Sequence, residues 1–462
     1  MRMSDTEAIM WLVEKDPALR SDFCNLTILE RPPDEDRVPP VLERALAAIP
    51  RLGQRVVGAP LRIATPAFAD DPTLDLNAHV RRVRVPGRGT DRDLLDLCGA
   101  LAEQPLDRAR PLWEFTLIEG LADGRAALLQ KVHHTITDGV GGLRLSLAFV
   151  DFEPDPPADA PPLVTPSEEE TAAAPGPGTP LQATSSAVVD VATRNVALAR
   201  RVLGDTTRAI VRPQELPTRA ADLARLATSV RRQVFNTDPA RSDVMTERSL
   251  ARYFETYATS LPGVQAVARK LGGSVNDAYV TALAGALGRY HEHLGSDVTT
   301  LRLAMPISTR DRGDDSANRF VPARVVVPIQ PAHDPPELFA RVRDRLAIAR
   351  NESAISAAES MAGFLTALPT SLLVALTRAQ TRTTDFAATN LRGSPVPLYI
   401  AGARVVASYP FGPRTGTALN ATVLSYCDEL HLGLNIDPAA IADPDTLMID
   451  VDASFEALLG LA

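Results

Sequence analysis

The chain has 462 residues, of which 45% are hydrophobic and 23% are charged. It is too long for one ordinary domain, and this balance is typical of a folded globular protein, which excludes the disordered and fibrous classes. The formal net charge of −9 disfavours general nucleic-acid binding, because that mode depends on cationic side chains that neutralise phosphates.

The first residues and the cysteines bear on the compartment. The start, MRMSDTEAIMWLVEKD, carries charges where a signal peptide needs its apolar stretch. The cysteines Cys24, Cys98 and Cys427 are odd in number and far apart, so neither a disulfide framework nor a CxxC metal site is indicated. No run reaches the roughly 18 apolar residues of a membrane-spanning helix. We therefore expect a cytoplasmic protein without a resident metal.

The first elements with a clear pattern lie before residue 135. Leucines at helical spacing predict a helix over 94–106, and alternation predicts strands over 113–118 and 125–132. Asp123 and Gly124 supply a tight-turn signal between the two strands. We expect these strands to form a hairpin.

A change of composition then separates the chain into two halves. Residues 151–185 are rich in proline and acid and predict a solvated linker. Residues 186–240 are rich in arginine and predict amphipathic crossover helices, whose basic face could contact anionic lipid headgroups or, the slightly favoured interpretation, simply be solvated. The apolar run 361–376 is interpreted as a buried core segment rather than an interfacial membrane contact.

Helix and strand patterns alternate again after residue 249. Helices are predicted over 263–271 and 275–292, and strands over 301–306, 323–329, 403–408, 421–426 and 429–435. Helices mixed with hairpins and longer crossovers indicate an α/β or α+β layered fold. We expect an N-terminal domain over 1–150 and a C-terminal domain over 241–462.

The motif that carries chemistry is KVHHTITDGVGG, in which His133 and His134 end the second hairpin strand. We expect a loop from Thr135 onward, because Thr135, Ile136 and Thr137 are poor helix formers and glycines follow. Histidine, with an unperturbed pKa near 6.5, can remove a proton from a hydroxyl at neutral pH. No GxSxG motif is present and no cysteine lies nearby, so direct transfer is simpler than an acyl-enzyme.

Two other interpretations of the histidines remain open. His-His-Asp could ligate a metal, although HExxH is missing and no other His or Cys cluster accompanies it. A structural pair of core histidines would explain a lone histidine better than it explains a doubled one followed by Asp-Gly.

HHTITDG resembles the HHxxxDG signature of the CoA-dependent acyltransferase superfamily, which includes chloramphenicol acetyltransferase, nonribosomal condensation domains and the bacterial wax ester synthase/diacylglycerol acyltransferase family. Further segments resemble that last family, in its order and over most of the chain. They are 72–87, 105–121 with its Pro-Leu-Trp, Asn276-Asp277, 305–310, 397–413 and 419–430.

The resemblance implies two chloramphenicol-acetyltransferase-like domains, with mixed sheets flanked by helices and an active-site tunnel between them. It assigns the general base to His134 and a supporting role to His133. It implies that Asp138 forms a structural ion pair, for which we nominate Arg310, and that Gly139 clears the channel wall or permits a special backbone angle.

Asn276 would donate a hydrogen bond to the tetrahedral oxyanion; the alternative is a helix N-cap. The resemblance implies acyl-CoA as co-substrate, no further cofactor, and peripheral association with a membrane or lipid inclusions. The expected reaction acylates diacylglycerol to triacylglycerol. Wax ester synthesis from long-chain alcohols, acylation of another hydroxylated metabolite and lipid binding without catalysis are the alternatives.

Three departures from the family pattern bear on the substrate rather than on the fold. Residues 17–30 lack the usual Met-His-x-Gly stretch, Thr135 replaces the common alanine, and 389–397 differ from the usual Ser-Asn-Val-Pro-Gly-Pro run. Acyl length and oligomeric state are not encoded in any recognisable motif.

Overall fold

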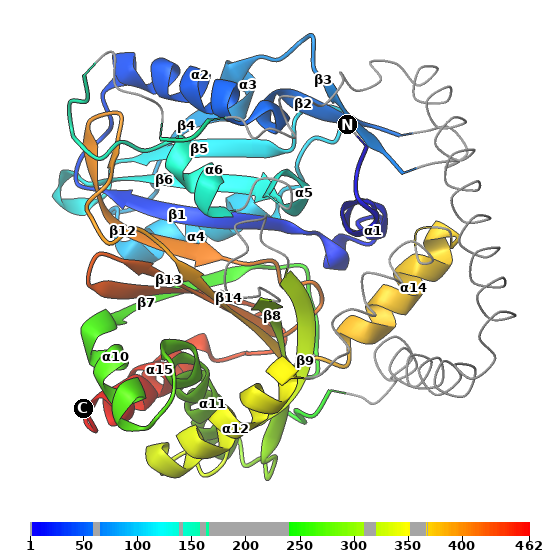
Figure 1. Cartoon of the computed structure of the whole chain (residues 1–462), viewed down its shortest axis with the longest axis vertical. Coiled ribbons are helices and arrows are strands. Elements are labelled where there is room, and N and C mark those ends of the chain that lie inside the picture. The colour runs from blue at the N-terminus through cyan, green and yellow to red at the C-terminus, as the bar shows by residue number, and fades with distance from the viewer. Residues whose placement is uncertain are drawn as a thin grey trace, which may run out of the picture.

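The computed structural model describes residues 2–58, 65–137, 142–157, 163–165, 240–308, 320–351, 366 and 368–462. Most of the predicted linker and nearly all of the arginine-rich segment 186–240 lie outside the described residues. Two six-stranded sheets organise the described chain, one in the upper and one in the lower unit of Figure 1. This confirms the mixed α/β class.

The first sheet has the strand order β11-β12-β1-β6-β5-β4. Its strands are β1 (Asp22–Leu29), β4 (Val80–Arg84), β5 (Trp113–Glu119), β6 (Ala126–His133), β11 (Tyr399–Ile400) and β12 (Ala403–Phe411). The predicted hairpin is confirmed, since β5 and β6 pair antiparallel. The turn between them uses positive φ angles at Asp123 and Gly124, which explains the Asp-Gly sequence.

The second sheet has the order β7-β14-β13-β10-β8-β9. Its strands are β7 (Tyr253–Ser260), β8 (Thr300–Ser308), β9 (Phe320–Pro328), β10 (Phe386–Arg392), β13 (Leu419–Tyr426) and β14 (Glu429–Ile436). Every strand predicted for this half of the chain is present. A small separate sheet pairs β2 (Gln54–Val57) with β3 (Ala67–Asp70).

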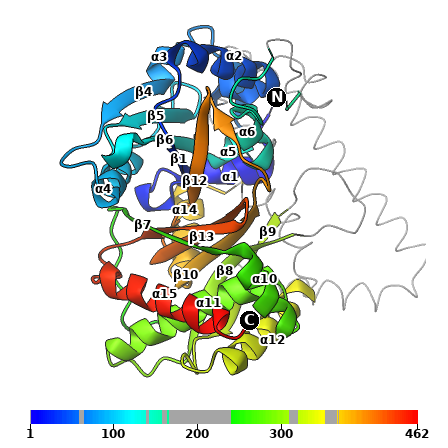
Figure 2. The ribbon, with the colours of Figure 1, turned by 90° about the vertical axis from the view of Figure 1, so that its left-hand side faces the viewer.

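Strands β11 and β12 belong to the first sheet although they lie late in the chain. β12 pairs antiparallel with β1, with Cys24 opposite Phe411, and Figure 2 shows β12 beside the other strands of the upper unit. The boundaries 1–150 and 241–462 stay a prediction, and sheet membership cuts across them. A segment of the C-terminal half therefore completes the sheet that carries His133.

Helices flank both sheets. In the first half they are α1 (Asp5–Val13), α2 (Val38–Ala48), α3 (Leu76–His79), α4 (Asp91–Glu103), α5 (His134–Thr137) and α6 (Gly142–Ala148). In the second half they are α10 (Leu261–Lys270), α11 (Val275–His293), α12 (Pro335–Asn351), α14 (Thr370–Thr381) and α15 (Pro444–Leu459). Short 3-10 turns include η1 (Pro17–Leu19), η2 (Glu35–Arg37) and η3 (Pro50–Gly53).

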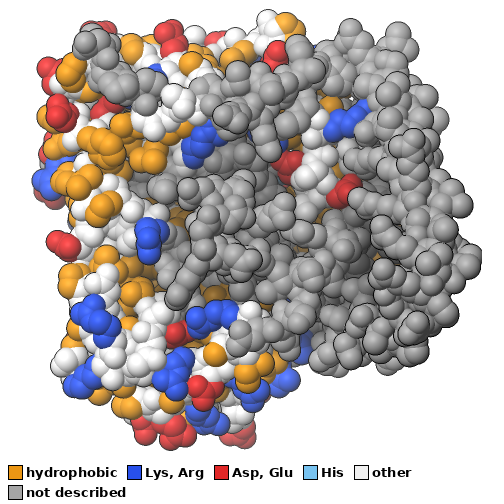
Figure 3. Space-filling view, viewed as in Figure 1, with side chains coloured by type: hydrophobic (Ala, Val, Ile, Leu, Met, Phe, Trp, Pro, Cys, Tyr) orange, Lys and Arg blue, Asp and Glu red, His pale blue; other side chains and the backbone are white. Residues whose placement is uncertain are grey.

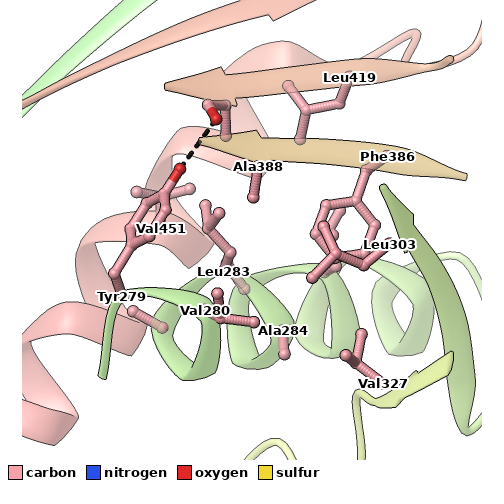
Figure 4. Close-up of a cluster of buried hydrophobic side chains, with 14 of the residues drawn as sticks. Tyr279, Val280, Leu283, Ala284, Leu303, Val327, Phe386, Ala388, Leu419 and Val451 are labelled. Atoms are coloured by element: carbon pink, nitrogen blue, oxygen red, sulfur yellow. Dashed lines mark hydrogen bonds between the residues drawn. The ribbon is translucent and has the colours of Figure 1, made fainter. Parts of the chain in front are cut away.

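The largest core lies between α11 and the second sheet. Figure 4 shows side chains of α11 facing those of β8, β10 and β13, and all of these side chains are buried. Burial of apolar area contributes roughly 25 cal/mol per Å². The hydroxyl of Tyr279 donates to the carbonyl oxygen of Ala421 at 2.9 Å, so the polar atom in this core is satisfied.

Helix α14 covers part of the apolar run 361–376, of which 361–365 and 367 lie outside the described residues. Leu373 is buried against Val13 and Leu19, but Leu372 is 46% exposed. The prediction of a buried core segment is therefore wrong for the outer face of this helix, because only one face packs on the first unit. Within the described residues, no helix is long and apolar enough to cross a membrane.

Candidate active site

The two histidines of the motif lie where strand β6 meets helix α5. His133 is the last residue of β6 and lies opposite Asp22 of β1, whereas His134 opens the single turn of α5. The expectation of a loop from Thr135 onward is wrong for residues 135–137. The propensity cost of Thr135 and its neighbours is below about 0.7 kcal/mol each, and contacts from distant parts of the chain outweigh it.

One of those contacts comes from Arg51, whose guanidinium donates to the carbonyl oxygen of Thr135 at 2.7 Å. Arg51 is buried together with its ion-pair partner Glu7, and it also lies over the ring of Phe68 at 4.5 Å. A buried charge that is both paired and hydrogen-bonded resists displacement. Arg51 thus fixes the backbone one residue after His134.

His133 is held in one tautomer by its neighbours. The backbone N–H of Thr135 donates to His133 Nδ1 at 3.1 Å, so Nδ1 carries a lone pair and Nε2 carries the proton. Nε2 then donates to Glu14 Oε1 at 2.7 Å. The hydroxyl oxygen of Thr135 lies 2.8 Å from the same Nδ1, which gives this departure from the family's alanine a structural explanation.

The carboxylate of Glu14 also reaches the backbone of His134 through Ser21. The Ser21 N–H donates to Glu14 Oε1 at 2.7 Å, and the Ser21 carbonyl accepts the His134 N–H at 3.1 Å. Glu14, Ser21, His134 and His133 therefore form a closed hydrogen-bonded ring. This ring fixes the position from which the His134 side chain projects.

The imidazole of His134 lies among apolar and acidic neighbours. Its ring centre is 5.0 Å from that of Phe23, and the residue remains partly accessible to solvent. Burial, together with the adjacent His133, lowers the pKa of His134 to about 4, while the carboxylates of Asp22 and Glu14 oppose this shift. His134 is therefore neutral near pH 7, and a neutral imidazole carries a lone pair on one of its two ring nitrogens.

Three of the other predicted site residues, Asp138, Gly139 and Arg310, lie outside the described residues. Their predicted roles, and metal ligation that uses Asp138, stay predictions. Within the described ranges, no group of three or more His, Cys, Asp or Glu side chains is arranged to hold a metal ion.

Asn276 is the second residue of α11 and is half-buried. Ser274 caps this helix and forms a capping box with Asp277, so the N-cap interpretation of Asn276 is wrong. Figure 1 shows α11 on the face of the second sheet that points away from the first unit. The oxyanion role of Asn276 stays a prediction.

Glu14, Ser21 and Arg51 were not predicted as site residues. Glu14 lies 119 positions from His133 in the chain, and no motif links the two. For Glu14, the only signal in the sequence is that a charged residue follows an apolar helical stretch. For Arg51, the only signal is that a charged residue lies between a proline and a leucine. Such a signal is too common to identify a site.

Comparisons with known proteins decide the family. The model described as wax ester synthase/diacylglycerol acyltransferase catalytic domain matches residues 3–279, and the WS/DGAT C-terminal domain matches residues 317–459. The chain belongs to the wax ester synthase/diacylglycerol acyltransferase family. It is an acyltransferase, as the HHTITDG motif indicated.

Curated relatives of this family support the assignment over the whole chain. A Mycobacterium tuberculosis (strain H37Rv) protein, whose name assigns it to the diacylglycerol O-acyltransferases, is 34% identical over 100% of this chain and 93% of its own length. A Mycobacterium bovis protein with the same type of name is 27% identical over 95% of this chain and 91% of its own.

Solved structures show the same fold. The wax ester synthase/diacylglycerol acyltransferase from Marinobacter aquaeolei VT8 superposes with a TM-score of 0.64 at 22% identity, covering 99% of this chain and 98% of that one. A mutant starter condensation domain of rhizomide synthetase, solved with C8-CoA and Leu-SNAC, gives a TM-score of 0.56 at 14% identity, covering 100% and 94%. The fold is thus shared with this condensation domain.

Proposed function

We propose that this acyltransferase moves a fatty acyl group from acyl-CoA to the free hydroxyl of diacylglycerol, which gives triacylglycerol. The observation that carries the mechanism is the neutral imidazole of His134, fixed at the junction of β6 and α5 by the Glu14 ring. The names of relatives that align with nearly the whole chain support diacylglycerol as acceptor.

His134 would act as a general base. Its lone pair accepts the hydroxyl proton while the hydroxyl oxygen bonds to the thioester carbon. When the tetrahedral intermediate collapses, the carbon–sulfur bond breaks and the imidazolium returns the proton to the departing sulfur. The products are an ester and free CoA, and no bond to the protein forms at any stage.

The imidazolium formed in this step would lie in surroundings that disfavour it. Burial, together with the adjacent His133, holds the pKa of His134 down, whereas Asp22 and Glu14 act in the opposite direction. Their carboxylates would therefore stabilise the charge that develops on His134 during the reaction. We assign no donor to the oxyanion beyond the predicted role of Asn276.

One observation supports acyl-CoA as the donor, and a second one leaves another acceptor to be tested. A condensation domain of the same fold was solved with C8-CoA. The family is named for wax ester synthesis as well as for diacylglycerol acylation, and so a long-chain alcohol is the second candidate acceptor. The hydroxyl oxygen of Thr135, which departs from the family's alanine, lies 2.8 Å from His133 Nδ1.

The decisive experiment measures thiol release from palmitoyl-CoA by the purified wild type, with diacylglycerol and with hexadecanol as separate acceptors. His134→Gln keeps the size and a hydrogen-bonding group but provides no base, and its melting temperature reports folding. We expect acceptor-dependent release in the wild type, greater with diacylglycerol, and a loss of at least about a hundredfold in the variant. Faster release with hexadecanol would make the chain a wax ester synthase.

The acceptor is insoluble, so we also propose peripheral binding to a lipid surface. On the described part of the face in Figure 3, acidic, basic and apolar side chains are interspersed. Leu372 on α14 is an exposed apolar side chain that could contact the lipid surface. Most of the second candidate region, 186–240, lies outside the described residues. Vesicle flotation of wild type and Leu372→Glu tests α14, and equal flotation would exclude it.

A further inference from the structure

Four arginines line a pocket close to the start of strand β1. They are Arg20, Arg248, Arg252 and Arg414, and the one carboxylate in the pocket wall belongs to Asp437. The walls come from η1, from the segment that precedes β7, and from the loop 414–417 between β12 and β13. A concentration of guanidinium groups is unexpected in a chain whose net charge is −9.

Two of the arginines are held by carboxylates and build the frame of the pocket. Arg414 contacts Asp437 at 2.7 Å, and Arg252 contacts Asp22 at 2.9 Å. Asp437 also accepts the backbone N–H and the hydroxyl of Ser249 at 2.8 and 2.6 Å. These contacts fix the geometry of the pocket, and they leave the positive charges of Arg20 and Arg248 without a neutralising carboxylate among the described residues.

The other two arginines have no carboxylate partner within the described residues. Arg248 donates to the carbonyl oxygens of Gly416, Met245 and Glu247, and Arg20 donates to those of Pro17 and Glu103. In both side chains the described contacts leave the second terminal nitrogen, Nη2, without a hydrogen bond. The guanidinium groups of Arg20 and Arg248 are therefore positively charged and each has N–H donors left for a ligand. Phosphate groups are bound by guanidinium groups of this kind.

The pocket and the candidate base share the start of β1. Arg20 immediately precedes Ser21, whose carbonyl holds the His134 N–H. Asp22, the partner of Arg252, lies opposite His133 in the sheet. A ligand with phosphates in the pocket could therefore extend a chain toward His134, as acyl-CoA does through its pantetheine arm.

We infer that this arginine pocket binds phosphate groups of the acyl-CoA donor. The inference rests on the proposed function, because it names the part of the protein that recognises the donor of that reaction. It assigns Arg20 and Arg248 to donor binding rather than to chemistry. Because dissolved salt screens the attraction between these charges and phosphate, the KM for acyl-CoA should rise with ionic strength.

The test uses the full-length protein and three thioesters: palmitoyl-CoA, palmitoyl-dephospho-CoA and palmitoyl-pantetheine, which carries no phosphate. The variants are Arg20→Gln, at a partly exposed position, and Arg248→Gln; the control is Arg341→Gln on the exposed face of α12. We expect each pocket variant to raise the KM for palmitoyl-CoA about tenfold with kcat within twofold. We expect the KM for palmitoyl-pantetheine to be unchanged.

Several outcomes would overturn the inference. They are an unchanged KM for palmitoyl-CoA in both variants, an equal rise for palmitoyl-pantetheine, or an equal KM for all three thioesters in the wild type. Loss of flotation on phosphatidic acid vesicles by Arg20→Gln, with its KM for palmitoyl-CoA intact, would assign the pocket to lipid phosphate instead.

Calorimetric binding of CoA separates this inference from the proposed function. If the wild type transfers no acyl group but binds CoA, and Arg20→Gln weakens that binding about tenfold, the pocket stands and the proposed reaction fails. If acyl transfer to diacylglycerol proceeds and CoA binding is the same in wild type and variants, the reaction stands and the pocket assignment fails.

Discussion

Glu14 Oε1 lies 2.7 Å from His133 Nε2 and accepts the Ser21 N–H at the same distance, so one carboxylate oxygen ties helix α1 to both histidines of the motif. Glu14→Gln keeps an oxygen for both bonds but removes the charge. We expect kcat to fall about tenfold, since a charge several ångströms away contributes on the order of 1–2 kcal/mol, while the melting temperature changes little.

Glu14→Ala should add a structural cost to this loss. It leaves two buried N–H donors without a partner, at about 1–3 kcal/mol each, so urea unfolding should show a lower stability than in Glu14→Gln. Asp36→Asn, at an exposed carboxylate in η2, serves as control. A kcat of Glu14→Gln equal to that of the wild type would remove the charge of Glu14 from the mechanism.

The pH dependence of kcat/KM should report the lowered pKa of His134, about 4. Because the neutral imidazole is the active form, we expect a flat rate from about pH 8 down to pH 5.5 and a decline only below that. Removing the charge of Glu14 lowers the pKa further, so Glu14→Gln should shift the acid limb to lower pH. An acid limb near pH 6.5, the ordinary value for histidine, would contradict the lowered pKa of His134.

The same titration affects stability and needs its own control. Unfolded His134 takes up a proton below about pH 6.5, whereas the folded residue stays neutral down to about pH 4. The unfolded state therefore binds more protons in this window, and stability decreases as the pH falls through it. Circular dichroism at each pH, for wild type and His134→Gln, separates loss of fold from loss of base.

Arg51 and Glu7 form a buried ion pair that also holds the carbonyl of Thr135. Arg51→Met should destabilise the protein by about 3–5 kcal/mol, because the carboxylate of Glu7 stays buried without its partner. The double variant Arg51→Met/Glu7→Gln removes both charges and should recover part of that loss in urea unfolding. A double variant as unstable as the sum of the single variants would show that the pair is not coupled.

Tyr279 offers a test of the core between α11 and the second sheet. Tyr279→Phe removes the hydroxyl that donates to the buried carbonyl of Ala421, a residue of β13 that is paired with both β10 and β14, and should cost about 0.5–1.5 kcal/mol. The matched control is Tyr399→Phe on β11, whose hydroxyl makes no hydrogen bond with the described part of the chain; it should change stability by less than about 0.5 kcal/mol. Equal effects of the two substitutions would argue against the hydrogen bond.

Local patterns predicted most elements of the fold. Alternation located β5, β6, β13 and β14, and helical spacing located α4 and α11, since each signal lies within its own segment. Pairing partners are not encoded in this way. Nothing near Cys24 indicates that Phe411 lies opposite it, so the sheet membership of β12 could not be read from the chain.

In the candidate site, too, the residues of one local segment could be predicted, whereas those contributed by distant segments could not. His133 and His134 were predicted because a short motif contains both, together with the strand that ends at them. Glu14 and Arg51 act on this motif from distant segments, and the one-turn helix α5 depends on them. Tertiary contacts decided the conformation of Thr135, where propensity alone favoured a loop.

The placement of β12 beside β1 has a consequence for synthesis on the ribosome. β1 leaves the ribosome early, but one of its two neighbours in the sheet becomes available only when residue 411 has been made. Until then the growing chain carries an unpaired strand edge next to the catalytic motif, and such edges promote association with other chains. Nascent chains that stop before β11 should therefore depend on chaperones, and the site should mature only as translation nears its end.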